Sequence, residues 1–230
     1  LRANKIGSEC FRLWKACDAQ VGDDFQINPE EIEAKYFGVL TKLFNVARFA
    51  SQFDTPDDLD TTPSDLSVED RWILAEFSST MERAESGWSN LDIYTATQAL
   101  KTFGTGVLPS HWLEMSKSRL YDGDVNAAWT IHRIVRDLMS ALSPVCPFFT
   151  HHISSTLYES SAVDVREFPT RTPDDETLRG LTSAIEDFNG ATWKTKKEAG
   201  LSLNAPIGGI VIPEELSEFT TILTQMHKLE

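Results

Sequence analysis

The sequence predicts a mainly α-helical protein, built as a helical bundle followed by a small α+β segment. Apolar residues recur at three- and four-residue spacing through most of residues 29–160, which is the period of one helix face. Helix-capping residues precede two of these stretches. After residue 160 the pattern changes, and residues 209–212 have the composition of a short strand between two helices.

The first helix of the bundle is predicted to begin at Pro29 and to end near Phe53. Asn28 is the expected N-cap, a proline suits the first helical position, and Glu31 is placed for a capping box. The apolar face is continuous and contains Ile32, Tyr36, Val39, Leu40, Leu43, Val46, Ala47 and Ala50. This pattern indicates a long amphipathic helix.

An acidic, proline-containing loop, residues 54–65, separates this helix from the next. Ser67 and Asp70 repeat the capping pattern and open a helix that is predicted to reach about Trp88. A third helical stretch covers residues 91–121. It contains three residues that favour a kink or a break, namely Gly104, Gly106 and Pro109.

Two more helices are predicted to complete the bundle. Residues 122–124 form a turn, and the helix after it carries one apolar face. The residues on that face are Val125, Ala128, Trp129, His132, Val135, Leu138, Met139 and Leu142. A short helix then runs from about Phe148 to Tyr158.

The segment after the bundle is predicted to mix extended and helical structure. Residues 165–168 are expected to be extended and residues 174–199 helical, with Gly200 as a left-handed cap. A strand over residues 209–212 and a last helix that begins at Pro213 complete this α+β segment.

The composition narrows the class of protein. No apolar run approaches the ~20 residues that span a bilayer, and the N-terminus has no signal-peptide pattern. Cys10, Cys17 and Cys146 show no C-x-x-C spacing, so neither a zinc site nor a disulfide framework is predicted. A reducing, cytoplasmic location is expected. The net charge of −14 argues against a non-specific polyanion binder, so RNA binding needs a local patch.

The tetrapeptide MSKS, residues 115–118, resembles the KMSKS loop with which class I aminoacyl-tRNA synthetases hold ATP. Such a loop must be mobile and exposed, so that its lysine can close on phosphates. Here the helical pattern places Met115 and Ser116 on an inner face, and Glu114 stands where the first lysine of the loop belongs. We therefore interpret the match as a coincidence.

No catalytic constellation is found, since the sequence has no Walker loop, Rossmann glycine fingerprint or H-E-x-x-H motif. His132 lies on an apolar face and is predicted to be a hydrogen-bonded core histidine. His151 and His152 are adjacent and point to different helix faces, which is poor geometry for a shared metal. Trp72 and Trp112 are predicted to be core residues. We predict no catalytic residue and no metal site in this chain.

Several motifs then occur in chain order. They are residues 12–14 (RLW), 22–24 (GDD), Leu43 with Asn45, Arg48 and Phe49, 70–74 (DRWIL), 111–114 (HWLE), Lys117 with 119–121 (RLY), 142–153 (LSPVCPFFTHHI) and 193–207 (WKTKKEAGLSLNAPI). This set resembles the valyl-tRNA synthetases, which are class Ia aminoacyl-tRNA synthetases, and especially the archaeal type. The resemblance covers nearly the whole chain and implies a helical bundle of the class Ia anticodon-binding type.

The resemblance implies three regions. Residues 1–28 correspond to the tail of the catalytic half and its junction, residues 29–160 to the anticodon-binding bundle, and residues 161–230 to a small α+β subdomain. It also implies a parent valine–tRNA ligase that uses ATP and Mg²⁺ to form valyl-adenylate and then charges tRNA. This chain alone is expected to be non-catalytic and to need no cofactor. Its expected partners are a valine-type tRNA and the catalytic and editing domains of the same enzyme, with no membrane or DNA.

The first candidate tRNA-binding patch lies on the predicted helix after Pro29, opposite its apolar face. It is a stripe without acidic side chains, formed by Gly38, Thr41, Asn45, Arg48 and Gln52 and flanked by Lys42 and Phe49. Asparagine and arginine can bind base edges, and an aromatic ring can stack on an unpaired base. The alternative is an ordinary solvated face, and the resemblance favours RNA contact.

Two further patches are candidates. One contains Lys117, Arg119 and Tyr121, and the other is the lysine-rich segment 193–197 with Lys194, Lys196 and Lys197. The lysines of the second segment can contact phosphates, which positions a tRNA without reading its sequence. The alternative, which the sequence favours slightly, is that they are cations that stabilise the C-terminal end of a helix.

Two other functions stay open from the sequence. The chain can be the anticodon domain of an isoleucyl- or leucyl-type synthetase. It can also be a freestanding acidic helical interaction module that no longer binds tRNA, which the net charge of −14 favours. Binding to tRNA at low salt separates the module from the anticodon domains.

Overall fold

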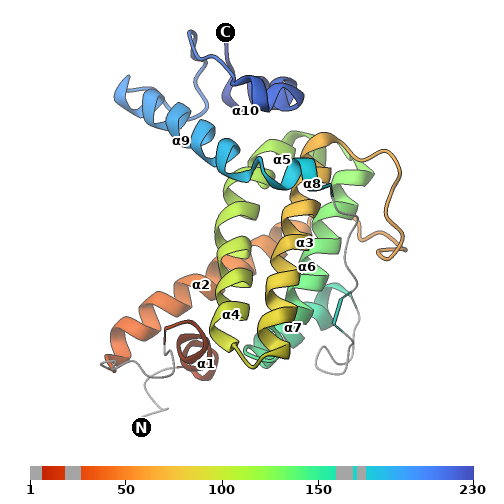
Figure 1. The fold of residues 1–230 in the computed structure, drawn as a ribbon, viewed down its shortest axis with the longest axis vertical. Helices are drawn as coiled ribbons and strands as arrows, with labels where there is room; N and C mark the ends of the chain where they lie inside the picture. Colours follow the sequence, from red (N-terminus) through yellow and green to blue (C-terminus); the bar gives the residue numbers. More distant parts are fainter. Residues whose placement is uncertain (1–6, 19–26, 159–167, 170–174) are drawn as a thin grey trace.

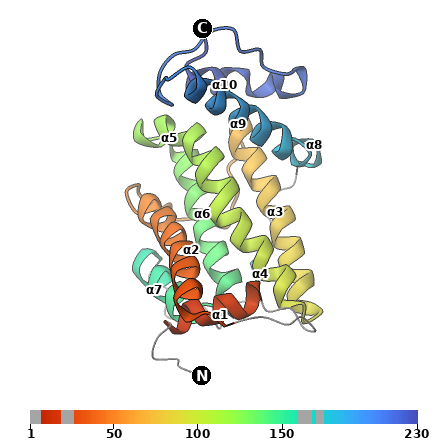
Figure 2. The same ribbon diagram turned by 90° about the vertical axis from the view of Figure 1, so that its left-hand side faces the viewer.

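The structure is a bundle of helices that carries a smaller helical segment at one end (Figures 1 and 2). It is a computed structural model that describes residues 7–18, 27–158, 168–169 and 175–230. The helices are α1 (Ser8–Cys17), α2 (Pro29–Ala50), α3 (Val68–Ser89), α4 (Ile93–Thr102), the π-helix η1 (Phe103–Trp112), α5 (Leu113–Tyr121), α6 (Val125–Leu142), α7 (Pro147–Leu157), α8 (Glu176–Arg179), α9 (Thr182–Glu198), the 3₁₀-helix η2 (Glu214–Phe219) and α10 (Thr220–His227). The predicted mainly α-helical bundle is confirmed.

The helices α3 and α6 and the rod formed by α4, η1 and α5 run side by side as the centre of the bundle (Figures 1 and 2). Helix α2 crosses this centre at an angle, and α1 and α7 lie at its lower end. The segment from α8 to α10 covers the upper end, where α9 contacts η1 and α10 contacts α5. No helix in the described part of the chain combines the length and apolarity needed to cross a bilayer.

The starts of α2 and α3 follow from local capping chemistry. The side chain of Asn28 accepts a hydrogen bond from the backbone N–H of Glu30 at 3.2 Å, which caps α2. The hydroxyl of Ser67 accepts from the backbone N–H of Asp70 at 3.4 Å and caps α3. Both predicted helices are confirmed, but α2 ends at Ala50 rather than near residue 53.

The stretch from α4 to α5 corrects the predicted kink or break. Helix η1 is a π-helix of 10 residues that joins α4 to α5 without leaving the helical conformation. Its wider turn accommodates Pro109, which has no N–H to donate. Gly104 lets the neighbouring helices approach, because an added Cβ would lie 2.7 Å from Leu43 Cδ2 and 2.9 Å from Leu138 Cδ2.

The core confirms three sequence predictions. Trp72 and Trp112 are both fully buried, and each indole N–H donates inside the protein, to Thr182 Oγ1 at 3.0 Å and to Asp70 Oδ1 at 3.1 Å respectively. His132 is also fully buried, and its two ring nitrogens lie 3.2 Å from a tyrosine hydroxyl and 3.1 Å from a backbone carbonyl. Burial lowers the pKa of His132, as expected for a neutral core histidine.

Arg119, near the C-terminal end of α5, joins three helices. Its guanidinium donates to Ser67 Oγ at 2.6 Å, to Glu69 Oε1 at 2.7 Å, to Asp70 Oδ2 at 2.7 Å and to Asp124 Oδ2 at 2.9 Å. The serine and Asp124 are the N-caps of α3 and α6. A cation at the end of α5 also complements the dipole of that helix. We call these five residues the Arg119 cluster.

The segment after the bundle partly departs from the prediction. The helix predicted over residues 174–199 is found as two helices, α8 and α9, and Gly200 follows with φ +69°. Residue 174 lies outside the described residues. The strand predicted for residues 209–212 is wrong, because nothing in the described residues pairs with them and Val211 is 85% exposed. One isolated parallel bridge joins Ile207 to Leu229 instead. The extended segment predicted at 165–168 lies almost entirely outside the described residues.

The Arg119 cluster predicts a large stability effect. Arg119→Ala leaves the buried Asp70 carboxylate without its counter-charge, so we expect the free energy of unfolding to fall by about 3–5 kcal/mol. Arg71→Ala is the matched control, because Arg71 is 44% exposed and pairs with Asp175 at 3.0 Å on the surface. It should cost less than about 1 kcal/mol. Urea unfolding measures both, and equal losses would show that the cluster has no special role.

Candidate nucleic-acid interface

The polar stripe predicted on α2 is exposed in the structure. Thr41, Asn45 and Arg48 face solvent, while Leu43 and Val46 on the opposite side are buried. The exposed positions follow from the helical period, since the apolar face of α2 packs on α6 and η1. In the described part of the chain, Arg48 makes no ion pair with an acidic side chain. Its guanidinium is therefore available to an external ligand.

A groove runs between α2, η1 and α5, with a volume of about 320 Å³. It brings the α2 stripe together with the second predicted patch, because Lys117 of α5 lies on its far wall. The residues that line it are Lys42, Asn45, Val46, Phe49, Thr105, Pro109, Ser110, Leu113, Glu114 and Lys117. We call this the α2–α5 groove.

The π-helix η1 contributes one wall of the α2–α5 groove, which the sequence analysis missed. Thr105, Pro109 and Ser110 all come from η1. The same glycine- and proline-containing stretch was expected to interrupt the helix, and the only available signal was its irregular composition. Lys117 also pairs with Glu114 at 3.3 Å, but both side chains are about half exposed. Such a surface pair is weak, so it leaves the ammonium available to a phosphate.

Two of the predicted tRNA-binding residues are corrected by the structure. Arg119 is held by four side chains in the Arg119 cluster and is not free to bind phosphate. Burial alone would lower its pKa, but the hydrogen bond and charge of Asp70 outweigh burial and raise the pKa above its usual range. Lys196 is fully buried, and its ammonium donates to the carbonyls of Leu203 and His227, both at 2.7 Å. Both cations are structural.

The other two lysines of the third patch are exposed. Lys194 lies 3.9 Å from Glu198, and the two side chains are 75% and 68% exposed. Lys197 is also on the surface of α9. The third patch therefore keeps two of its three predicted lysines, at the end of α9 that projects from the bundle (Figure 1).

A buried polar chain fixes α9 on the bundle. Asn189 of α9 lies with its amide nitrogen 2.9 Å from Nδ1 of His111, at the end of η1. Its amide oxygen lies 2.7 Å from Nε2 of His227, at the end of α10. All three side chains are buried, and the amide contacts one ring nitrogen of each imidazole. Nδ1 of His227 is buried without a hydrogen-bond partner among the described residues. This contact sets where α9 carries its lysines relative to the bundle.

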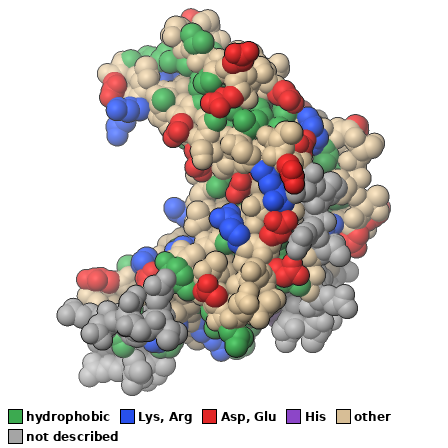
Figure 3. Space-filling model, in the orientation of Figure 1, with side chains coloured by type: hydrophobic (Ala, Val, Ile, Leu, Met, Phe, Trp, Pro, Cys, Tyr) green, Lys and Arg blue, Asp and Glu red, His purple; other side chains and the backbone are tan. Residues whose placement is uncertain are grey.

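The surface is hollowed between two projecting parts of the molecule. In the space-filling view, one arm is formed by the segment around α9 and α10 and the other by the start of α2, and Lys and Arg side chains border the hollow between them (Figure 3). Acidic side chains are scattered over the same face, and some of them lie at the upper wall of the hollow. A protein of net charge −14 thus presents basic groups on one concave side.

The MSKS tetrapeptide has no exposed loop. Met115 and Ser116 are 2% and 0% exposed within α5, which confirms the prediction that they face inward. Lys117 cannot close over a nucleotide as a mobile loop does, because it is fixed on a helix. Among the described residues, no group of three His, Cys, Asp or Glu side chains is arranged to hold a metal ion.

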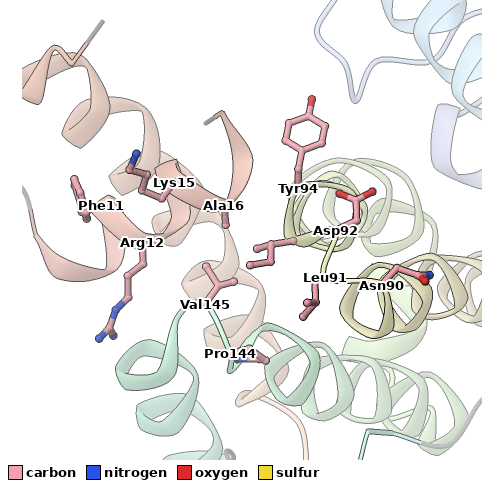
Figure 4. Close-up of a pocket in the computed structure, with 11 residues that line it drawn as sticks. Phe11, Arg12, Lys15, Ala16, Asn90, Leu91, Asp92, Tyr94, Pro144 and Val145 are labelled. Atoms are coloured by element: carbon pink, nitrogen blue, oxygen red, sulfur yellow. The ribbon is translucent and has the colours of Figure 1, made fainter. Parts of the chain in front are cut away.

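A second hollow lies at the opposite end, between α1 and the turns after α3 and α6 (Figure 4). Its volume is about 680 Å³, and its lining includes Phe11, Arg12, Leu91 and Ile93. Leu91 is 84% exposed and has φ +58°, an uncommon conformation for a leucine. Among the described residues, this end of the molecule therefore presents exposed apolar side chains.

The family model described as "Anticodon-binding domain of tRNA ligase" matches residues 70–211. The chain belongs to this family. The valine–tRNA ligase of Aeropyrum pernix is 30% identical over 97% of this chain and 28% of its own length. The valine–tRNA ligase of Saccharolobus solfataricus is 32% identical over 90% of this chain and 24% of its own length. The chain thus spans about a quarter of these relatives.

A solved structure confirms the fold of this anticodon-binding domain. The LeuRS of Agrobacterium radiobacter K84, in a ternary complex with tRNA and LeuAMS, superimposes with a TM-score of 0.58. The match covers 77% of this chain and 21% of that chain at 14% sequence identity. The sequence motifs predicted an anticodon-binding domain with a helical-bundle fold, and both predictions are confirmed.

Two adjacent lysines of the domain provide a test of the structural assignment of Lys196. In Lys196→Met, two buried carbonyls lose their donor, and we expect the free energy of unfolding to fall by about 1–3 kcal/mol. Lys197→Met removes the same charge from an exposed position and should change it by less than about 0.5 kcal/mol. Thermal unfolding compares the two, and a larger loss in Lys197→Met would contradict the assignment.

The pKa of His227 predicts a loss of stability in mild acid. Burial and the nearby charge of Lys196 lower this pKa from 6.5 to about 4. Between these values the unfolded chain binds a proton that the folded chain does not, so the free energy of unfolding falls as pH falls. The slope is about 1.4 kcal/mol per pH unit, and the contribution is constant above the unfolded pKa. Urea unfolding across this window measures it.

The control for this pH dependence is His227→Gln, which keeps a donor for Asn189 but has no titratable ring. As pH falls, the free energy of unfolding of this variant should decrease less steeply than that of the wild type. The difference in slope is that of one bound proton, about 1.4 kcal/mol per pH unit. Identical slopes for the two proteins would show that His227 does not titrate in this way.

Proposed function

We propose that this chain binds the anticodon arm of a tRNA in the α2–α5 groove, as the anticodon-binding part of a valine–tRNA ligase. The observation that carries the proposal is the exposed, acid-free stripe of α2, in which Asn45 and Arg48 lie beside Lys42. Amide and guanidinium groups bind base edges, and lysines position the phosphate backbone. Lys117 on the facing wall adds a second cation.

The two arms of the molecule extend this surface. The exposed Lys194 and Lys197 stand on the α9 arm, across the hollow from the start of α2. They are suited to phosphate contacts at a distance from the bases, which orient a duplex stem without reading it. The bases are then bound by the α2–α5 groove and the stem by the α9 arm, because the first turn of α2 carries Glu30 and Glu31.

Valine is the proposed amino acid of the parent enzyme. Supporting this, the sequence similarity to valine–tRNA ligases extends over 90% or more of the chain. The alternative is that the parent enzyme is a leucyl- or isoleucyl-type synthetase whose anticodon-binding part has the same RNA-binding role. The structural likeness to a LeuRS keeps this alternative open. Charging assays on the full-length enzyme with valine, isoleucine and leucine separate these possibilities.

Catalysis is proposed to belong to the rest of that enzyme. The parent uses ATP and Mg²⁺ to form valyl-adenylate and transfers the valyl group to tRNA in the cytoplasm. This chain needs no cofactor of its own, which is consistent with the burial of Met115 and Ser116 in α5.

The other domains of the enzyme are proposed to pack at the α1 end. The hollow of Figure 4 supports this, because Leu91 and Ile93, which line it, are 84% and 47% exposed. Large apolar side chains gathered at one end of a protein are typical of an interface. The curated relatives are also about four times as long as this chain, and that extra length supplies the partner domains.

A second candidate function is favoured by one observation, the net charge of −14. An acidic helical module that binds other proteins does not need the α2 stripe and should ignore tRNA even at low salt. Salt-dependent binding of tRNA therefore distinguishes the two functions.

We expect this chain to bind a valine-type tRNA transcript and to bind less well when the anticodon is altered. Arg48→Ala and Asn45→Ala should each weaken binding by about 5- to 150-fold, which corresponds to the ~1–3 kcal/mol of a base-edge contact. Filter binding or fluorescence anisotropy at low and moderate salt measures the affinity.

Arg83→Ala is the matched control for this test. Arg83 is 55% exposed and pairs with Glu76 at 3.5 Å on α3, away from the groove. It should bind tRNA as the wild type does. Equal losses in all three variants would indicate a diffuse charge effect, and no binding by the wild type would favour the acidic interaction module.

A further inference from the structure

Three aromatic rings meet where α2 and α5 end. Phe49 and Phe53 lie with ring centroids 5.1 Å apart, and the ring of Tyr121 is 6.1 Å from the first and 5.7 Å from the second. The interplanar angles are 69°, 85° and 64°, so each pair is edge-to-face. This is the favoured geometry for aromatic pairs, and it holds each ring in a fixed orientation. We call these residues the aromatic trio.

The trio is buried on one side only. Phe49 and Phe53 are partly buried and pack against the main core, whereas Tyr121 is 60% exposed. Within the described residues its hydroxyl has no hydrogen-bond partner. Tyr121 is the last residue of α5, and the chain turns just after it, at Gly123, which has φ +82°. A large ring is thus fixed by two others while much of its surface faces solvent.

Tyr121 lines another hollow, which lies next to the α2–α5 groove and which we call the Tyr121 hollow. This hollow has a volume of about 630 Å³. Apolar groups form much of it, namely Phe53, Pro56, Pro63, Leu120, Val125, Ala128 and Trp129. Gln52 and Asn126 place amide groups on its lining, beside the carboxylates Asp54 and Asp124. Phe49 lines the α2–α5 groove, whereas Phe53 and Tyr121 line the Tyr121 hollow, so the trio separates the two.

The chemistry of the hollow selects a flat, uncharged group. Asp54 and Asp124 would repel a phosphate, and the second of these is already bound to Arg119. Apolar walls and an aromatic ring favour a planar π-system, and amides on the lining can hydrogen-bond to its edge. The neighbouring cations Lys42 and Lys117 line the α2–α5 groove on the other side of the trio, where they can stabilise a phosphate backbone.

We propose that Tyr121, held in place by Phe49 and Phe53, is a stacking platform for one unpaired base of the anticodon loop. This base enters the Tyr121 hollow. This rests on the proposed tRNA-binding function and adds a residue and a subsite to it. The RNA backbone follows the α2 stripe, and the base turns over the trio and stacks on the exposed ring. Stacking on a ring tolerates every base, so this subsite contributes affinity rather than sequence reading.

The test uses the full chain and valine-type tRNA transcripts that carry 2-aminopurine at single positions of the anticodon loop. Fluorescence of this base is quenched when it stacks. We expect binding of the wild type to quench one loop position, and Tyr121→Phe to do the same because the ring remains. Tyr121→Leu should lose the quenching and weaken binding by about 5- to 150-fold, the range for one stacked base.

Two controls make the result specific. Phe148→Leu removes another exposed aromatic ring, 66% exposed on α7 at the opposite end, and should leave quenching and affinity unchanged. Thermal unfolding of Tyr121→Leu checks that the trio's loss of one ring has not unfolded the domain. Tyr121→Trp is a second aromatic variant, and we expect it to preserve the quenching because the larger ring can still stack.

The outcomes distinguish this proposal from the one on which it rests. If Arg48→Ala loses tRNA binding while Tyr121→Leu keeps both affinity and quenching, the platform is wrong and the anticodon function stands. If the wild type binds no transcript, both proposals are overturned. If the quenching disappears in Tyr121→Leu and persists in Tyr121→Phe and Phe148→Leu, the platform is supported.

Discussion

The ion pair between the partly buried Arg119 and the fully buried Asp70 is the interaction on which the rest of this structure depends. The arginine lies 2.7 Å from that carboxylate, which also accepts the indole N–H of Trp112. Since Arg119 binds the N-caps of α3 and α6 as well, one side chain fixes three helices at the upper end of the bundle. The last turn of α5 is thereby held against α2, which places Tyr121 beside the α2 stripe.

This arrangement explains how a chain of net charge −14 can present a surface for RNA. Some of its carboxylates are buried and paired with arginines. Asp70 pairs with Arg119, and Asp137 pairs with both Arg133 and Arg136. The α2 stripe contributes no acid, so the field near it is set by local cations rather than by the net charge. Salt screens distant surface charges over about 8–10 Å, which strengthens this local argument.

The sequence predicts those features that are decided locally. The caps at Asn28 and Ser67 and the exposed face of α2 follow from nearest neighbours and the helical period, and all three are found. The structural roles of Arg119 and Lys196 escape sequence analysis, because their partners lie up to 52 residues away along the chain. The helix η1 and the absent strand at 209–212 escape it for a related reason. Whether a glycine–proline stretch breaks, or an apolar run pairs, depends on neighbours that only the fold supplies.

Lysine acetylation footprinting, with and without a valine-type tRNA, tests the central claim that the concave side around the α2–α5 groove binds RNA. Mass spectrometry follows the modification of each lysine. The account predicts that tRNA shields Lys42 and Lys117, that Lys15 on the exposed side of α1 stays reactive, and that buried Lys196 reacts poorly in both states. Shielding of Lys15 with unchanged reactivity at Lys42 and Lys117 would contradict the account and move the interface to the α1 end.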